Sequence, residues 1–224
     1  MVSPREHGQA SFFAPPYNAA SFRYRIEYLL LLIVVALVRA IPLEIATALS
    51  ARAWRLFAVH GRRHKRALAN LELAFPELTP SQRNEIACKM WCNLGRIMAE
   101  TMQLDRLLLR SDCIKVRNAK LLERYRGKNG PSIFVSLHMG NWELGTWPLV
   151  REGINPAGIY RVVTNPYVDR HLRNIRDQLL PAGQFASGGA DGYRAGHASA
   201  RRLVNFIRGG GRLCLLCDLF DRSG

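Results

Sequence analysis

The fold of this chain is decided by the stretch SIFVSLHMGNWELG, which runs from Ser132 to Gly145. Its first half is a short apolar run rich in β-branched and aromatic residues, which is typical of a buried strand. Gly140 closes the run, and a helical pattern follows it. The stretch therefore predicts a strand that ends near Leu137, a turn that contains His138, and a helix that begins near Asn141 or Trp142.

His138 and Glu143 lie on either side of this turn, five positions apart. A neutral imidazole can take a proton from a hydroxyl group, and a carboxylate on its other nitrogen fixes the tautomer and stabilises the imidazolium that forms. A histidine and a glutamate five positions apart also occur by chance. The position of this pair at the end of a strand is therefore what favours a catalytic role. Because reacting groups in open α/β sheets gather beyond the carboxyl ends of strands, we predict that His138 is a catalytic base and that Glu143 orients it.

Strand and helix patterns alternate along the rest of the chain after Cys113. Helical patterns cover residues 119–126, 142–152 and 197–208, and a further helix opens at Asn165-Pro166. Strand patterns cover residues 133–137, 157–163 and 213–217. The glycine-rich residues 181–196 read as a surface loop, with a lid over the site as the alternative. This alternation predicts an α/β fold with a mostly parallel central sheet flanked by helices.

Three further residues are candidates for substrate binding. Arg161 falls near the carboxyl end of its strand, where it can bind a phosphate; the alternative is an ion pair with Asp169. Asp218 follows the last strand at the same edge of the sheet. Asn141 and the backbone amides of residues 139–142 are candidates for stabilising an oxyanion, because a helix start presents free N–H groups.

The N-terminal third predicts a membrane-associating helical region that precedes the α/β domain. Residues 1–22 have no periodicity and are expected to form a flexible arm. The apolar run of residues 29–38 is shorter than the roughly twenty residues that a membrane span needs. Either a single span or a helix lying in the interface would tether the chain. Residues 45–66 interleave six arginines and lysines with aromatic and aliphatic residues, which is typical of a helix on an anionic membrane. The alternative is a solvated helix face packed on the core.

The composition indicates which kind of partner the protein binds and in which cellular compartment it lies. The net charge of +15 and the isoelectric point of about 10.4 imply anionic partners. The chain has five cysteines, an odd number, and they lie in apolar stretches of the sequence. Both observations favour free thiols in a reducing compartment over a set of disulfides. Cys214 and Cys217 form a C-x-x-C pair inside a strand pattern, and no second pair completes a zinc site, so no metal site is predicted. Basic residues that follow the apolar run predict that the body of the protein lies in the cytoplasm.

Four segments, in order along the chain, carry a resemblance to a known family. They are NLELAFPELT at residues 70–79, SLHMGNWELG at residues 136–145, YRVVTNPYVDR at residues 160–170 and GGRLCLLCDLFDRSG at residues 210–224. With them the chain resembles the bacterial lipid A biosynthesis acyltransferases, the late lauroyl and myristoyl transferases of the lysophospholipid-acyltransferase-like superfamily. In that family an aspartate at the place of Asp218 is usually followed by glutamine, whereas Leu219 stands here, so Asp218 is expected only to shape the site.

The resemblance implies an activity, a donor and a location. The enzyme would move a fatty acyl chain from acyl-carrier protein or acyl-CoA to a hydroxyl of a lipid A precursor at the cytoplasmic face of the bacterial inner membrane. His138 would activate the hydroxyl and Glu143 would support it, with no covalent acyl-enzyme, cofactor or metal. The family continues past the position of Gly224, so the acyltransferase domain, residues 67–224, is expected to be truncated at its C-terminal end.

Two alternatives remain open from the sequence. The acceptor could be another glycolipid, such as a phosphatidylinositol mannoside, because acceptor choice depends on groove shape. The chain could also be a basic membrane-binding protein without catalysis. Nucleic acid is disfavoured as a partner, because no recognised binding module is present and the basic region coincides with an apolar anchor.

Overall fold

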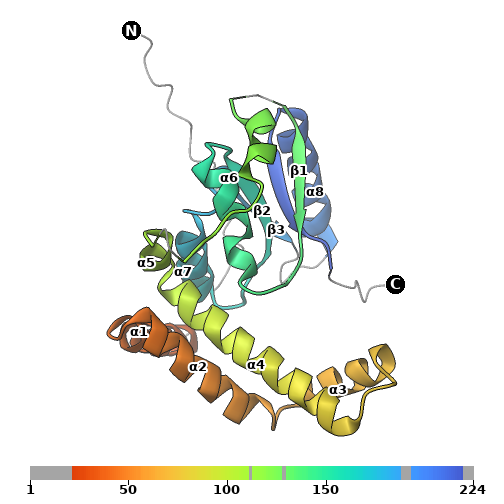
Figure 1. Ribbon diagram of the computed structural model, residues 1–224. Coiled ribbons are helices and arrows are strands. Elements are labelled where there is room, and N and C mark those ends of the chain that lie inside the picture. The colour runs from red at the N-terminus through yellow and green to blue at the C-terminus, as the bar shows by residue number, and fades with distance from the viewer. Residues whose placement is uncertain (1–21, 111–112, 128–129, 188–192, 219–224) are drawn as a thin grey trace.

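The computed structural model describes residues 22–110, 113–127, 130–187 and 193–218, with the backbone alone over residues 193–199. The described chain has two parts (Figure 1). A layer of N-terminal helices lies at one side, and a parallel sheet with its helices lies above it. The turn that follows the first strand faces the helical layer.

The sheet has four strands, all parallel, in the order β1-β4-β2-β3. The strands are β1 (Ser132–Ser136), β2 (Pro156–Arg161), β3 (Gly183–Ser187) and β4 (Arg212–Leu216). The helices of this part are η1 (Ala119–Tyr125), η2 (Trp142–Thr146), α6 (Trp147–Arg151), α7 (Pro166–Arg176) and α8 (Tyr193–Arg208), where η marks a 3-10 helix. The predicted α/β class with a parallel sheet and flanking helices is confirmed.

The core of this part lies between the sheet and α8. Leu213 of β4, Ala157 of β2 and Phe185 of β3 form one buried cluster, and Phe206 and Ile207 of α8 pack on it. Phe185 belongs to β3, which lies inside the glycine-rich segment that was predicted to be a loop. That prediction was wrong for residues 183–187. The strand is short and has no β-branched residue, so its pairing with β2 and the burial of Phe185 decide its conformation.

The helical layer is built from α1 (Phe22–Arg39), α2 (Leu43–Ala58), α3 (Arg62–Ala74), α4 (Pro80–Met102) and α5 (Leu104–Leu108). α2 packs along α4, where Trp54 stacks on Trp91 with ring centroids 6.2 Å apart. The start of α4 forms the predicted capping box between Thr79 and Gln82. The basic region of residues 45–66 is divided between α2 and α3, because Gly61 caps a new helix that begins at Arg62.

A glycine allows α2 and α4 to touch. The Ser50 hydroxyl donates a hydrogen bond to the carbonyl of Gly95 at 2.7 Å. A Cβ atom at Gly95 would lie 2.6 Å from the carbonyl oxygen of Ser50 and 2.8 Å from the Cα of Ala51. Both contacts are with backbone, which cannot rotate away. The position therefore requires glycine although it lies inside a helix, where glycine is intrinsically unfavourable.

We expect Gly95→Ala to destabilise the protein by about 1–3 kcal/mol, because the two backbones must separate to admit one methyl group. Urea unfolding followed by circular dichroism measures the change. Gly130→Ala is the matched control, since a Cβ there has no atom within 4 Å and needs no unusual backbone angle. Equal stability of the two variants would contradict the close helix contact.

The N-terminal end of α1 is attached to the start of α7. Asn165, the residue that caps α7, donates hydrogen bonds from its amide to the carbonyl of Tyr24 at 2.8 Å and to the carboxylate of Glu27 at 3.0 Å. Tyr28 stacks on Tyr167 with ring centroids 5.9 Å apart. Residues more than a hundred positions apart therefore join the first helix to the α/β part.

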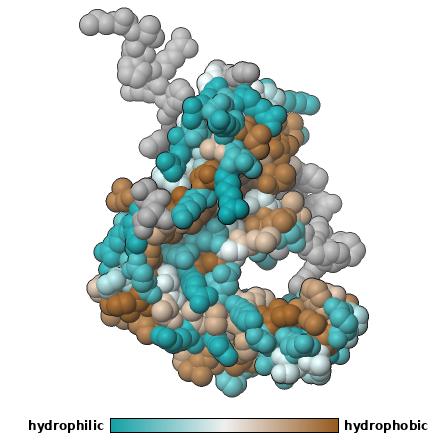
Figure 2. Space-filling model, in the orientation of Figure 1, coloured by the Kyte–Doolittle hydropathy of each residue, from teal (hydrophilic) through white to brown (hydrophobic). Residues whose placement is uncertain are grey.

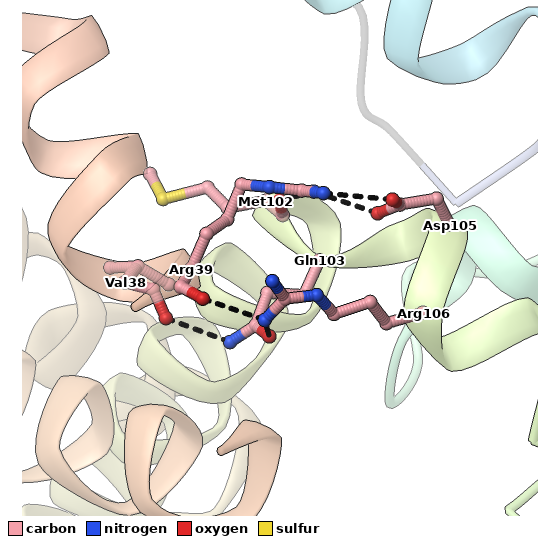
Figure 3. A network of polar contacts seen from close by, with 6 residues as sticks. All are labelled: Val38, Arg39, Met102, Gln103, Asp105 and Arg106. Carbon is pink, nitrogen blue, oxygen red and sulfur yellow. Dashed lines mark hydrogen bonds and ion pairs between the residues drawn. The ribbon is translucent and has the colours of Figure 1, made fainter. Parts of the chain in front are cut away.

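The other end of α1 is held at the corner between α4 and α5 (Figure 3). Arg39 forms a two-pronged ion pair with Asp105, at 2.7 and 2.8 Å. Gln103, fully buried, donates to the carbonyl of Val38 at 2.9 Å, and Arg106 donates to the carbonyl of Arg39 at 2.6 Å. The arginine that interrupts the apolar run thus pairs within the protein. Of the helices in the described ranges, none combines the length and apolarity needed to cross a membrane.

We expect the Arg39–Asp105 pair to stabilise the protein by on the order of 1 kcal/mol, since both side chains are partly exposed. The hydrogen bond from Arg39 lowers the pKa of Asp105 from 3.8 to about 2. A lowered carboxyl pKa means stability that is present above pH 4 and is lost as the pH falls towards 2. Comparing the unfolding free energies of the parent and Asp105→Asn across this range measures it. In an Arg39→Gln background, Asp105→Asn should lower the free energy of unfolding only slightly, because the ion pair is already absent.

Candidate active site

The pairing of β1 with β4 brings His138 and Asp218 together. In this parallel register Ser136 lies beside Leu216, the last residue of β4. His138 and Asp218 each lie two residues beyond this last pair. The hydrogen bond from the Cys217 N–H to the Ser136 carbonyl at 3.1 Å continues the register past the strand ends. The two functional side chains therefore meet at the carboxyl edge of the sheet.

Asp218 holds His138 through two hydrogen bonds. Nδ1 of the imidazole lies 2.7 Å from Oδ1, and the backbone N–H of His138 donates to Oδ2 at 2.8 Å. An ionised carboxylate only accepts, so Nδ1 carries the proton and Nε2 presents a lone pair. The bond from the imidazole, followed by that from the backbone, lowers the pKa of Asp218 below its ordinary value. This arrangement is that of a base and its orienting group.

Among the described residues, no hydrogen bond or ion pair joins Glu143 to His138. It forms a two-pronged ion pair with Arg176 at the end of α7, with distances of 2.8 and 2.6 Å. Only 13% of the Glu143 side chain and 25% of the Arg176 side chain are exposed. The predicted hydrogen bond between Glu143 and His138 is therefore not formed, and Asp218 takes its place at the imidazole. η2 turns Glu143 towards α7, while the neighbouring strand supplies Asp218 to Nδ1.

Asn141 fixes the turn between His138 and Glu143. Its amide donates to the carboxylate of Glu100 on α4 at 2.6 Å, and its side-chain oxygen accepts the backbone N–H of Glu143 at 3.2 Å. The second bond makes Asn141 the cap of η2, in agreement with the predicted helix start. The contact with Glu100 ties the turn to the helical layer. Gly140, in this turn, has a φ of 52°, a conformation that favours glycine.

Arg161 ends β2 at the same edge of the sheet. The alternative to a ligand-binding role was an ion pair with Asp169, but Asp169 pairs with Arg173 at 3.2 Å and accepts the backbone N–H of Val163 at 2.9 Å. Within the described part of the chain, the Arg161 guanidinium has no hydrogen bond or ion pair. It is exposed at the edge and retains its donors for an anion.

One aromatic side chain contacts the imidazole, and two exposed apolar residues flank His138 in the chain. Trp142 meets His138 edge to face, with ring centroids 5.3 Å apart. Leu137 and Met139, the two neighbours of His138, are 43% and 72% exposed. Figure 2 shows the molecule hollowed between the helical layer and the α/β part. The turn thus joins a solvent-accessible base to apolar surface, which suits a substrate with both a hydroxyl group and hydrocarbon.

Two residues of this site were missed by sequence reasoning, Arg176 and Glu100. Neither lies at a strand end, and each reaches the turn from a different helix. Arg176 ends a helix with several other basic residues, so nothing in the sequence distinguishes it. Asp218 was predicted to shape the site, and the signal that could have assigned it a larger role was its position beyond a strand that pairs with β1.

Comparison with known proteins identifies the family. The sequence matches the family model described as bacterial lipid A biosynthesis acyltransferase over residues 17–182. This range holds α1, the helical layer and the turn with His138 and Glu143, and it ends before β4 and Asp218. No match is found among curated proteins. The match covers well over half of the chain, and the chain belongs to the bacterial lipid A biosynthesis acyltransferase family.

Proposed function

We propose that this acyltransferase moves a fatty acyl chain from an acyl thioester to a hydroxyl of a lipid A precursor. The observation that carries the proposal is the His138–Asp218 pair, which leaves Nε2 as a proton acceptor beside apolar side chains. The donor is acyl-carrier protein or acyl-CoA. Both are anionic, in keeping with the charge of +15.

The reaction needs one base and no covalent acyl-enzyme. Nε2 of His138 takes the proton of the acceptor hydroxyl while its oxygen attacks the thioester carbonyl, and Asp218 stabilises the imidazolium. The tetrahedral intermediate then collapses, the carbon–sulfur bond breaks, and the thiolate takes the proton back from Nε2. The products are an ester and a free thiol, and the base is returned to its starting state.

The turn also supplies groups for the developing negative charge. The backbone N–H groups of Gly140 and Asn141 have no hydrogen-bond partner among the residues that the structure describes. They remain candidates for the oxyanion, whereas the Asn141 side chain is engaged with Glu100 and with the cap of η2. The Glu143–Arg176 pair supports the turn as a positioning element. Arg161 is proposed to bind a phosphate of donor or acceptor.

We propose that the helical layer lies on the cytoplasmic face of the inner membrane. One face of α1 exposes a row of large apolar side chains, and α2 adds more, as the brown surface of Figure 2 shows in this layer. The exposed apolar residues of the two helices include Leu29, Leu30, Ile33, Leu37, Ile45, Leu49, Leu56 and Phe57. The same layer exposes arginines on α2 and α3. Apolar surface next to basic residues is typical of an interfacial helix.

An assay in detergent tests the proposed reaction. The protein is incubated with labelled acyl-carrier protein and, separately, with labelled acyl-CoA, and a lipid A precursor is the acceptor. We expect an ester product whose mass exceeds that of the acceptor by one acyl group. The folded protein could instead acylate another glycolipid, such as a phosphatidylinositol mannoside, and leave the precursor unchanged. The proposed acyl transfer would then stand, with a different acceptor. Transfer to neither would overturn the proposal.

A further inference from the structure

A groove in the helical layer lies apart from the catalytic turn. It has a volume of about 520 Å³, and residues of α2 and α4 line it, Arg52, Arg55 and Leu56 on one side and Asn84 and Cys88 on the other. Cys88 lies 12 residues before Glu100 on α4, which is roughly 18 Å along a helix at 1.5 Å per residue. The groove is thus separate from the His138 turn.

The groove is built for an anion. Arg52 and Arg55 are exposed, and within the described ranges neither forms a hydrogen bond or an ion pair. None of the residues that line the groove is acidic. Glu85, next to Asn84 in sequence, pairs with Lys89 at 2.6 Å, and its pKa is lowered first by Lys89 and to a smaller extent by the charge of Arg55. Two guanidinium groups three positions apart on a helix present their donors to one place, and guanidinium matches the geometry of phosphate.

Beside the arginines and the polar His60 and Asn84, the groove has apolar lining residues. These are Leu56 and Val59, and Leu56 is 63% exposed. A second hollow of about 310 Å³ lies along the same helix, lined by Trp54 and Phe57 with two alanines. A phosphate at the arginines would therefore leave hydrocarbon chains beside apolar side chains. A free phosphate ion has no hydrocarbon chain, so the apolar side chains beside the arginines favour a lipid over a free phosphate.

We propose that the groove between α2 and α4 binds the headgroup of an anionic glycerophospholipid, with the phosphate on Arg52 and Arg55. The lipid belongs to the surrounding membrane and is neither donor nor acceptor. Such a site would fix the orientation of the helical layer on the bilayer, because a bound headgroup holds one defined place on the protein surface. General attraction between basic residues and an anionic membrane does not select one orientation. This inference rests on the proposed function only in placing the protein at a membrane.

Cys88 reports on occupation of the groove. The full chain is treated with a maleimide, and labelling rates are measured for each cysteine by peptide mass spectrometry. Dihexanoyl phosphatidylglycerol, below its micelle concentration, is the probe; dihexanoyl phosphatidylcholine and inorganic phosphate are the comparisons. At a lipid concentration of about four times its Kd, we expect labelling of Cys88 to slow about five-fold. Exposed Cys113 in the same molecule should label at an unchanged rate.

Matched variants separate a site from general basic charge. Arg52→Gln/Arg55→Gln should abolish the protection of Cys88, whereas Arg62→Gln/Arg63→Gln, which removes the same charge from α3, should retain it. No protection by phosphatidylglycerol, equal protection by phosphatidylcholine or by phosphate, or equal loss in both double variants would overturn the inference. None of these readouts involves acyl transfer. Activity in detergent therefore tests the proposed function separately.

Discussion

His138→Gln should lower kcat for acyl transfer by about 10²–10⁴-fold, the usual contribution of a positioned general base. The glutamine amide can still donate a hydrogen bond to Asp218, which keeps the turn in place. It cannot accept a proton from the acceptor hydroxyl, because an amide nitrogen has no basic lone pair. The loss should therefore fall on kcat while KM for the acceptor changes little.

Initial rates with saturating acyl donor measure this loss, and circular dichroism with thermal unfolding checks that the fold is kept. Glu123→Gln, an exposed substitution on η1, is the control and should transfer at the parent rate. A folded His138→Gln protein that is as active as the parent would rule out His138 as the base. The chemistry would then have to come from another group at the carboxyl edge of the sheet.

Asp218→Asn should produce the second largest loss, about 10²-fold or more in kcat. The carboxylate accepts the Nδ1 proton at 2.7 Å and so leaves Nε2 free. An amide in its place can donate an N–H to Nδ1, which moves the imidazole proton to Nε2 and removes the lone pair that the reaction needs. The stabilising charge beside the imidazolium is lost in the same step.

Glu143→Gln is the matched comparison, because it makes the same change from carboxylate to amide in the turn that carries His138. It leaves the His138–Asp218 pair intact and weakens the ion pair with Arg176. We expect it to cost about 1.5–3 kcal/mol of stability and to lower kcat much less than Asp218→Asn does. A larger loss of kcat in Glu143→Gln than in Asp218→Asn would restore Glu143 as the group that orients His138.

The helical layer shows why an apolar run alone does not determine how a helix meets a membrane. Residues 29–38 have the composition of a short span, yet Arg39 pairs with Asp105 and Asn165 holds the other end of α1. These contacts fix α1 along the protein and leave its apolar face outward. The partners lie 66 and 138 or more positions away in the chain, so no local pattern could have named them.

Local chemistry in the sequence determined most of the secondary structure and the class of fold. The apolar run before His138, the capping box at Thr79 and the Asn165-Pro166 helix start each act within a few residues, and the structure confirms each of them. The alternation of strands and helices likewise sufficed for a parallel sheet, because parallel strands require helical crossovers. His138, Asp218 and Arg161 were placed at the carboxyl edge for the same reason.

Only the tertiary structure decided which carboxylate meets the imidazole. Glu143 is five positions from His138 in the sequence, whereas Asp218 is eighty positions away, and proximity in sequence favoured Glu143. The strand order β1-β4-β2-β3 reversed this preference, since it places β4 directly beside β1. Arg176 then draws Glu143 to α7. Strand order depends on how the whole chain packs, so a pattern read along one stretch of sequence could not contain it.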